Sequence, residues 1–322
     1  MEVIFPGFTE IIIMTTKLLW PKVPEMFPYQ QWFADAWQQY GLLVRKALPI
    51  SRKIGAAIGR VGLCRFLGLR RGRLVVCGCG RIESVAWPWC WFYEIVPVMW
   101  DLWPAYFEPF VRFVRRCRVK TVFVTSSVNV ARVRDRCPWV NVVWLPEGIK
   151  ASLYPMGPEL TKRRIDVLNY GRKIAWLTDA IKLYKSFLRP VNMLCVEEKR
   201  LIFDTHEALT AGLRDSKIAL CYPQSDTNPQ KVGDVETMSQ RYWECMLSGT
   251  LMIGHAPREL VSFCGYNPVI EIADRNLACE TIDHVLAHVE DYQPLANRNR
   301  KFAEENADWS ARIPIITKAL GL

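Results

Sequence analysis

The chain has 322 residues, enough for two domains of about 150 residues that each bury a core of their own. Half of its residues are hydrophobic, but no stretch of about 18 apolar residues is free of charges and prolines, so the sequence predicts no transmembrane helix. The formal net charge is +10, and it is uneven: 21 Lys and Arg stand against 10 Asp and Glu through Lys150, and 21 against 22 after it.

Cysteine usage and the opening residues indicate the compartment. The 11 cysteines are scattered, only Cys77 and Cys79 stand close together, and no group has the spacing of a zinc site. This pattern predicts reduced thiols in a cytoplasm and no metal centre. The stretch from Val3 to Trp20 lacks the basic start and small-residue cleavage site of a signal peptide, so we expect a soluble cytoplasmic protein.

Short β-rich runs alternate with helical patterns from Arg73 onward, which is typical of parallel sheets with helical crossovers. Before Arg73 no strand alternation stands out, so we expect mostly helices there and a small N-terminal sheet. The predicted strands of this first series are Leu74–Cys79, Glu94–Trp100, Thr121–Thr125 and Asn141–Leu145. The predicted helices are Pro104–Arg116 and Ser127–Arg136.

A second series follows a linker rich in proline and glycine, Pro146 to Pro158, so we place the domain boundary near residue 150. This gives an N-terminal domain 1–150 and a C-terminal domain 151–322. The predicted strands are Asp166–Tyr170, Val191–Val196, Lys217–Tyr222, Thr250–Gly254 and Val269–Ile272. The predicted helices are Lys173–Phe187, Thr205–Arg214, Thr237–Ser248, Pro257–Phe263 and the C-terminal stretch Leu277–Leu320. Two doubly wound domains bring the carboxyl ends of both sheets to the cleft between them, where ligands bind in such folds.

The basic residues of the first domain cluster at Arg45 to Arg73 and at Arg112 to Lys120, and both clusters are interleaved with apolar residues. An amphipathic basic surface of this kind suits an anionic membrane face or a polyanion. A solvated basic face without a partner is the alternative, and the sequence does not separate the two. No nucleic-acid-binding module is recognisable, so we do not expect nucleic acid as a partner.

Two glutamates of the second domain carry most of the functional information. Glu236 follows a loop rich in turn residues, and Glu244 stands eight residues later in a segment that reads as a helix opening at Thr237. The unpaired amides of Thr237, Met238 and Ser239, at the positive end of the helix dipole, would suit an anionic phosphate. Glu244 would lie two turns along the helix on nearly the same face as Glu236, so the two carboxylates can hold separate hydroxyl clusters of one ligand.

The stretch from Glu236 to Glu244, with Gly249-Thr250 and an apolar strand after it, resembles the E-x7-E signature of retaining GT-B glycosyltransferases of the group-1 type. The alternative is that the two glutamates decorate an exposed helix face. The resemblance extends over roughly residues 93 to 275 and implies an α/β fold of two Rossmann-like domains facing a cleft. The basic N-terminal domain would be the acceptor side, and the C-terminal domain would bind the donor.

A second match is the strand that ends in Gly171-Arg172, because the family's first C-terminal strand ends in Gly-Arg. Glycine allows a close turn, and the guanidinium can clamp a diphosphate. The sequence departs from the family at position 177, which is Leu where a Lys is common, and Lys173 is the candidate substitute.

The resemblance implies transfer of a sugar from a nucleotide-sugar donor to a glycan or lipid-linked acceptor, with retention of the anomeric configuration. Glu244 would bind the ribose hydroxyls and Glu236 those of the donor sugar. Arg172, with Gly171, Lys173 and the amides near Thr237 to Ser239, would stabilise the leaving diphosphate. GT-B enzymes bind the diphosphate without a chelated metal, so no metal or other cofactor is expected, and Asp234-Val-Glu236 is not read as a metal-binding DxD.

Three alternatives to this mechanism remain. An inverting enzyme would need a carboxylate base near the cleft, for which Asp101 and Glu83 are the candidates. A nucleotide-sugar epimerase would share the architecture but release a free altered sugar. A GT-B-like protein without activity would use its basic first half to hold a polyanion or partner. For the glycosyltransferase, we expect attachment to the cytoplasmic face of a membrane and a role in polysaccharide biosynthesis.

Overall fold

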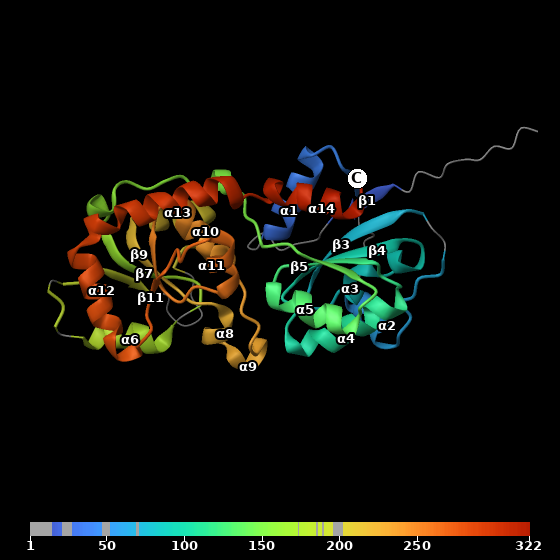
Figure 1. Ribbon diagram of the computed structural model, residues 1–322, viewed down its shortest axis with the longest axis horizontal. Helices are drawn as coiled ribbons and strands as arrows, with labels where there is room; N and C mark the ends of the chain where they lie inside the picture. Colours follow the sequence, from blue (N-terminus) through green and yellow to red (C-terminus); the bar gives the residue numbers. More distant parts are fainter. Residues whose placement is uncertain are drawn as a thin grey trace, which may run out of the picture.

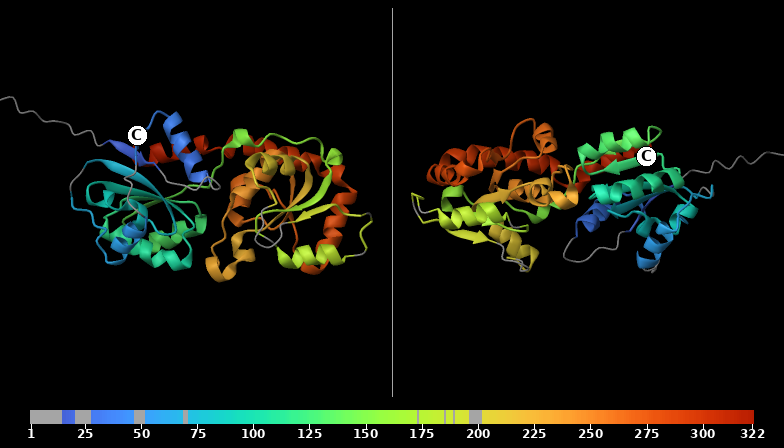
Figure 2. Two further views of the ribbon diagram at one scale, coloured as in Figure 1. Left: turned by 180° about the vertical axis from the view of Figure 1, so that it is seen from behind. Right: turned by 90° about the horizontal axis from the view of Figure 1, so that it is seen from below.

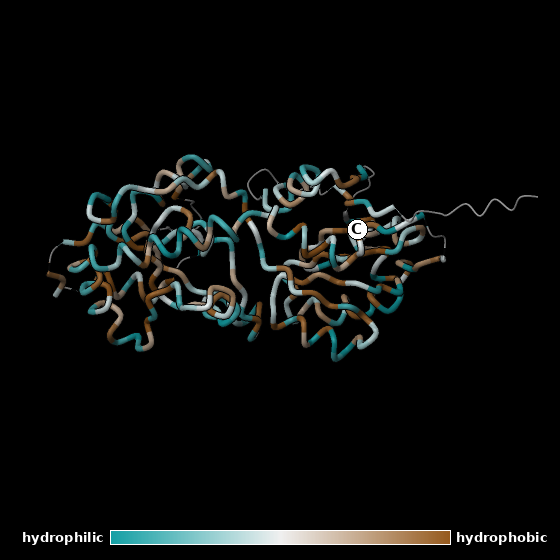
Figure 3. Tube along the Cα trace, turned by 45° about the horizontal axis from the view of Figure 1, so that its top comes forward, coloured by the Kyte–Doolittle hydropathy of each residue, from teal (hydrophilic) through white to brown (hydrophobic). Residues whose placement is uncertain are grey.

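The protein folds into two α/β lobes that lie side by side (Figure 1), described by a computed structural model over residues 15–20, 28–46, 52–68, 71–172, 174–184, 186–188, 190–195 and 202–322. Each lobe is built on one sheet of parallel strands, which confirms the predicted α/β class. The strands are apolar and run through the middle of each lobe (Figure 3), as expected where helices cover both faces of a sheet. Within these ranges no helix is long and apolar enough to cross a membrane.

The first sheet has six parallel strands in the order β2-β1-β3-β4-β5-β6. They are β1 (Thr16–Leu19), β2 (Leu43–Arg45), β3 (Arg73–Cys79), β4 (Glu94–Trp100), β5 (Thr121–Val124) and β6 (Asn141–Trp144). The strands from β3 onward were predicted to within one residue at each end. The prediction of a small N-terminal sheet is wrong, because β1 and β2 extend it. Strands of four and three residues are too short to show a period of two in the sequence.

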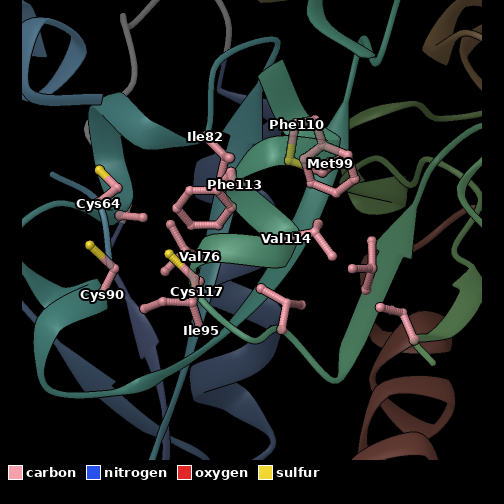
Figure 4. Close-up of a cluster of buried hydrophobic side chains, with 14 of the residues drawn as sticks. Cys64, Val76, Ile82, Cys90, Ile95, Met99, Phe110, Phe113, Val114 and Cys117 are labelled. Atoms are coloured by element: carbon pink, nitrogen blue, oxygen red, sulfur yellow. The ribbon is translucent and has the colours of Figure 1, made fainter. Parts of the chain in front are cut away.

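Helices pack on both faces of the first sheet (Figure 2). Strand β3 shows the alternation, since Leu74 and Val76 enter one core layer and Val75 and Cys77 enter the other. The first layer lies under α2 (Arg52–Arg60), α3 (Glu83–Ala86), α4 (Pro104–Arg116) and α5 (Ser127–Arg136). Figure 4 shows this layer, in which Phe110 and Phe113 of α4 lie among apolar residues of the sheet.

The last helix of the chain packs on the first lobe. The second core layer joins α1 (Tyr29–Gln39) to α14 (Ile313–Leu320), whose Ile313, Ile316 and Leu320 are buried beside Phe33 and Trp37. The domain boundary near residue 150 stays a prediction. The structure adds that the chain crosses between the lobes a second time, after α13 (Gln293–Asn306), so that two segments connect them.

The second sheet has five parallel strands in the order β11-β10-β9-β7-β8. They are β7 (Ile165–Asn169), β8 (Met193–Cys195), β9 (Ser216–Cys221), β10 (Leu251–Gly254) and β11 (Ile270–Glu271). All five were predicted to within two residues, apart from Val196, which lies outside the described residues. The helices around this sheet are α6 (Ala175–Leu183), α7 (His206–Arg214), α10 (Gln240–Ser248), α11 (Arg258–Cys264) and α12 (Ala278–Ala287).

Two expectations for the segment between β9 and α10 are wrong. It was predicted as a loop, but it contains two single-turn helices, α8 (Gln224–Thr227) and α9 (Pro229–Val232). Helix α10 begins at Gln240, three residues later than predicted, with Ser239 at the N-cap in an extended conformation. Glu236 and Glu244 therefore do not share one helix, because Glu236 lies on the segment that precedes it.

Candidate functional site

Residues that follow strands of both sheets come together between the lobes. Asp101 follows β4, Glu147 follows β6 and Arg172 follows β7, and their charges lie close enough to shift one another's pKa. The carboxyl ends of the two sheets thus face each other, as expected for two doubly wound domains. We call this group of residues, with those around Arg172 and Glu244 described below, the interlobe site.

The second sheet places Arg172 at its topological switch point. From β7 the chain moves to β8 on one side, then returns to β9 on the other side of β7, so the crossovers diverge between β7 and β9. Ligands of doubly wound sheets bind at the carboxyl end of such a point. Gly171 begins the turn after β7 with a φ of 73°, a conformation that favours glycine.

A second guanidinium, that of Arg241 on α10, lies beside Arg172. It stacks on the ring of Tyr170, with its central carbon 4.8 Å from the ring centroid, and a Cβ on Gly171 would overlap it. Glycine at position 171 is thus needed both for its backbone conformation and for this approach. Burial lowers the pKa of Arg172, and the positive charge of Arg241 lowers it further. Two cations this close are stabilised by an anion between them.

Glu244 is held by two tyrosine hydroxyls. Tyr154 donates to its Oε1 at 3.0 Å and Tyr170 donates to its Oε2 at 2.8 Å. Both tyrosines are buried, so their hydroxyls are fixed and the carboxylate is fixed with them. The carboxylate itself is half-buried. Each oxygen keeps a lone pair free to accept a hydrogen bond from a ligand. This geometry suits recognition of a pair of hydroxyl groups.

Glu236 forms a second acceptor group, separate from Glu244. Its Oε1 lies 3.0 Å from Nε2 of His255, its Oε2 accepts from Arg258 at 3.2 Å, and its side chain is only 12% exposed. Although burial lowers the pKa of His255, the hydrogen bond to Glu236 and the charge of Glu271 raise it above its ordinary value. A carboxyl group bound by His255 on one oxygen and by Arg258 on the other is held in one orientation.

The predicted phosphate-binding amides lie between these two carboxylates. The amide of Met238 donates to Oε1 of Glu259 at 2.6 Å, so it would have to exchange this partner before it could bind a phosphate. The amides of Thr237 and Ser239 make no hydrogen bond with any described residue. They remain available beside the first turn of α10, although the helix begins after them.

Helix α6 carries no cation at position 177, where the family commonly has a lysine. Lys173 lies outside the described residues. Leu177 is fully buried on α6 and packs into the core, so the position at which the family carries a lysine points away from the interlobe site here. Arg241, which approaches from α10 instead, supplies the second positive charge.

The first lobe contributes carboxyl groups. Asp101 has a φ of 52°, unusual for a residue other than glycine, and its carboxylate accepts a hydrogen bond from the Cys79 thiol at 3.1 Å. Burial raises the pKa of Asp101, partly offset by Cys79 and Arg172. Burial also raises the pKa of Glu147 well above its ordinary value, and the carboxylates of Asp101 and Glu259 add to this. A strained residue at a buried, charged position is a candidate functional group.

The segment before α10 is bound to the first lobe at several points. Ser126 donates through Oγ to the carbonyl oxygen of Glu236 at 3.3 Å, and Arg132 pairs with Asp234 at 2.6 Å. Oε2 of Glu259 accepts from the amide of Ser127, the first residue of α5, at 2.7 Å. Asp234 thus forms an ion pair with an arginine across the lobe interface.

Comparison with solved structures identifies the fold. Sucrose-phosphate synthase from Thermosynechococcus elongatus matches 95% of this chain and 98% of its own, with a TM-score of 0.66 and 13% identity. HepE from Anabaena, in complex with UDP and glucose, covers 95% of this chain and 99% of its own, with a TM-score of 0.60 and 9% identity. The DNA-modifying enzyme β-glucosyltransferase covers 96% and 100%, with a TM-score of 0.56 and 12% identity. This chain has the GT-B fold.

The GT-B match rests on structure alone. No protein-family model matches the sequence, and a search of curated proteins found no significant match. Coverage of 95 to 96% of this chain, with TM-scores of 0.56 to 0.66, shows that the backbone arrangement is shared well beyond residues 93 to 275, over which the sequence resemblance extends.

Within this GT-B chain the sequence pointed to some of the interlobe site and missed the rest. Arg241 stands inside the quoted E-x7-E stretch, and its place near the start of the helix was the available signal. Glu147 lies in the segment that was predicted only as the linker between the two domains. Tyr154 and Tyr170 give no sequence signal, because their contact with Glu244 joins residues up to 90 positions apart.

Glu83, the other candidate base, belongs to a different place. It is half-buried at the start of α3 and lines a pocket of the first lobe together with residues of α2 and α4. None of the pocket residues belongs to the interlobe site.

Proposed function

We propose that the protein is a glycosyltransferase that uses a UDP-sugar as its donor. The observation that carries this proposal is the pair Arg172 and Arg241 at the switch point of the second sheet, beside a carboxylate fixed by two tyrosines. The paired cations match a diphosphate, and the carboxylate of Glu244 matches the two hydroxyls of a ribose. The similar HepE structures contain UDP-glucose or UDP, and uridine diphosphoglucose is the substrate of the similar β-glucosyltransferase, which supports uridine as the base.

In the proposed mechanism the donor lies with its diphosphate against Arg172 and Arg241 and its sugar toward Glu236. The bond between the anomeric carbon and the phosphate oxygen breaks, and the acceptor oxygen forms the new bond to that carbon. The acceptor's proton passes to the leaving phosphate, and the guanidinium groups stabilise the charge on that phosphate. Free amides of Thr237 and Ser239 add neutral donors for the same oxygens. No cofactor takes part.

The proposed stereochemistry is retention, on the strength of the spacing of Glu236 and Glu244. Asp101 is the residue that an inverting reaction would use, since its buried carboxyl lies beside Arg172. The anomeric proton coupling of the first product, followed by NMR from UDP-glucose, separates the two. A product with the donor's configuration supports retention, and the opposite configuration would refute it and leave Asp101 as the candidate base.

The proposed acceptor is a glycan or a lipid-linked saccharide, and the first lobe holds it on the cytoplasmic face of a membrane. Its excess of basic residues, interleaved with apolar ones, supports this placement.

A thermal-shift panel with UDP, GDP, ADP, CDP and dTDP tests the donor site. A ligand at a hundred times its Kd adds about 2.7 kcal/mol to the stability of the folded protein. We expect UDP to raise the unfolding midpoint of the wild type and to fail with Glu244→Ala. Stabilisation by none of the five would refute the proposal. Analysis of the products then excludes an epimerase, which would convert UDP-glucose without any acceptor.

A further inference from the structure

A pocket of about 220 Å³ opens on the first lobe between α2, α3 and α4. Its walls combine arginines with one glutamate, two small residues and an apolar floor. The lining residues are Ala56, Gly59, Arg60, Cys64, Arg81, Glu83, Pro109, Arg112, Phe113 and Arg116. Figure 4 shows Cys64 and Phe113 of this floor beside Ile82 at the edge of the buried core. We call this the arginine pocket.

The arginine pocket gathers four positive charges against the single negative charge of Glu83. All four guanidinium groups belong to exposed residues: Arg60, Arg81, Arg112 and Arg116. None of them forms an ion pair with a carboxylate of the described residues. Nearby arginines behave differently, since Arg136 pairs with Glu108 and Arg132 with Asp234. Unpaired like charges that converge on one hollow favour an anionic occupant.

Glycines on α2 produce the shape of the arginine pocket. Side chains on Gly55 and Gly59 would collide with Ser84 and Glu83, so α2 can approach α3 closely only with glycine at both positions. This approach carries Arg60, at the end of α2, toward Arg112 and Arg116 on α4. Helix packing therefore brings Arg60, Arg112 and Arg116 together, while Arg81 lies on the connection between β3 and α3.

Exposed apolar side chains stand next to lining residues of the arginine pocket, since Val61 and Leu63 lie between Arg60 and Cys64 in the chain. On α2 and the segment that follows it, Ile54 is 51% exposed, Val61 72%, Leu63 51% and Leu67 56%. Arg65 is exposed between the two leucines. Helix α2 and the segment that follows it thus carry both cations of the pocket region and large exposed aliphatic side chains. A soluble phosphate compound or a nucleic acid would contact the cations and leave these aliphatic side chains in water.

We propose that this surface docks on a membrane containing anionic phospholipids, with a lipid phosphate in the arginine pocket and the aliphatic side chains of residues 54–67 among the acyl chains. The charge matches an anionic headgroup, and the aliphatic side chains match the hydrocarbon beside it. In Figure 1 α2 and α4 lie on the side of the molecule away from α13 and α14, so docking leaves those helices in water. The inference deepens the membrane attachment proposed above and does not depend on the donor site.

Vesicle co-sedimentation tests the proposal with the full chain. The probes are vesicles of phosphatidylcholine alone and vesicles in which about a third of the lipid is phosphatidylglycerol. Both are measured at low and at physiological salt. We expect binding only to the anionic vesicles. Arg112→Ser with Arg116→Ser should lower the partition coefficient roughly 30-fold, since each cation near an anionic surface contributes roughly a 5-fold gain. Val61→Ser with Leu63→Ser should weaken binding to the anionic vesicles at both salt concentrations, and proportionally more at physiological salt, where the charge contribution is partly screened.

The matched control is Lys301→Ser with Lys318→Ser, which removes two charges from α13 and α14 on another face of the molecule. This variant should keep its binding to anionic vesicles. Folding of every variant is checked by its unfolding midpoint and by its affinity for UDP, which the docking variants should keep. Equal losses in the control and pocket variants would overturn the proposal, as would binding of wild type to RNA or soluble inorganic phosphate but not to anionic vesicles. If the wild type bound anionic vesicles but did not bind UDP, only the proposed donor site would be refuted.

Discussion

Replacement of Arg172 by methionine tests the diphosphate clamp directly. Methionine keeps an unbranched apolar stem and removes the guanidinium charge, while Arg241 stays in place on Tyr170. We expect UDP to bind more weakly to this variant and uridine to bind as it does to the wild type. Uridine lacks the phosphates, so it reports the ribose contact of Glu244 without the clamp.

The expected size follows from the contact that is lost. A hydrogen bond to a charged group contributes about 1.5 to 3 kcal/mol, which corresponds to roughly a 10- to 150-fold rise in the Kd for UDP. The effect should lie in the upper part of this range. The bound diphosphate also offsets the repulsion between Arg172 and Arg241 in the wild type, and the variant has no such repulsion to offset.

The matched control is Arg164→Met. Arg164 precedes the same strand β7 that Arg172 follows, and it forms an exposed ion pair with Asp215 at the opposite edge of the sheet. Isothermal titration calorimetry with UDP, UMP and uridine gives the affinities. An unchanged Kd for UDP in Arg172→Met would refute the clamp. Equal losses for UDP and uridine would show that Arg172 supports the fold of the site and does not bind phosphate.

Three further results are expected. Tyr170→Phe frees one oxygen of Glu244 and should weaken UDP binding roughly 5-fold, by the loss of about 1 kcal/mol of positioning, in a fluorescence titration. Asp101→Asn should raise the unfolding midpoint at pH 7 and leave it nearly unchanged at pH 3. Burial raises the pKa of this carboxyl, so the folded state is favoured when the group is neutral, as it already is in the wild type at pH 3. Asn also tolerates the positive φ. His255→Gln should flatten the pH dependence of stability: the raised pKa of His255 means its pairing with Glu236 stabilises the fold below about pH 6.5 and is lost as pH rises through the folded value.

The sequence predicted best what depends on nearby residues. Strands β4 and β7 and helix α4 follow from runs of buried apolar residues or from helical spacing, and their ends were placed within one residue. Arg172 was predicted from the resemblance of its strand to that of the family and Asp101 as a candidate base, and the rule that a parallel sheet puts all its carboxyl ends at one edge placed both near the cleft.

The sequence failed where a distant part of the chain decides. Helix α10 was predicted to begin at Thr237, but the amide of Met238 is bound by Glu259, and this favours an extended segment over another helical turn. The two short strands β1 and β2 are stabilised by pairing within a sheet whose central strands come later in the chain. A single sequence contains no local trace of either contact.

The contacts of the segment before α10 tie the donor site to the arrangement of the lobes. Ser126 binds the backbone at Glu236, and Glu259 bridges the amides of Ser127 and Met238, so both ends of this short segment are attached to α5 of the first lobe. Glu244 has no such attachment, because both of its tyrosine partners belong to the second lobe and the linker that leads into it. A change in the angle between the lobes would therefore move Glu236 relative to Glu244. The sugar end of the proposed donor site, at Glu236, is thus hydrogen-bonded to the lobe proposed to carry the acceptor, while the ribose end, at Glu244, is not.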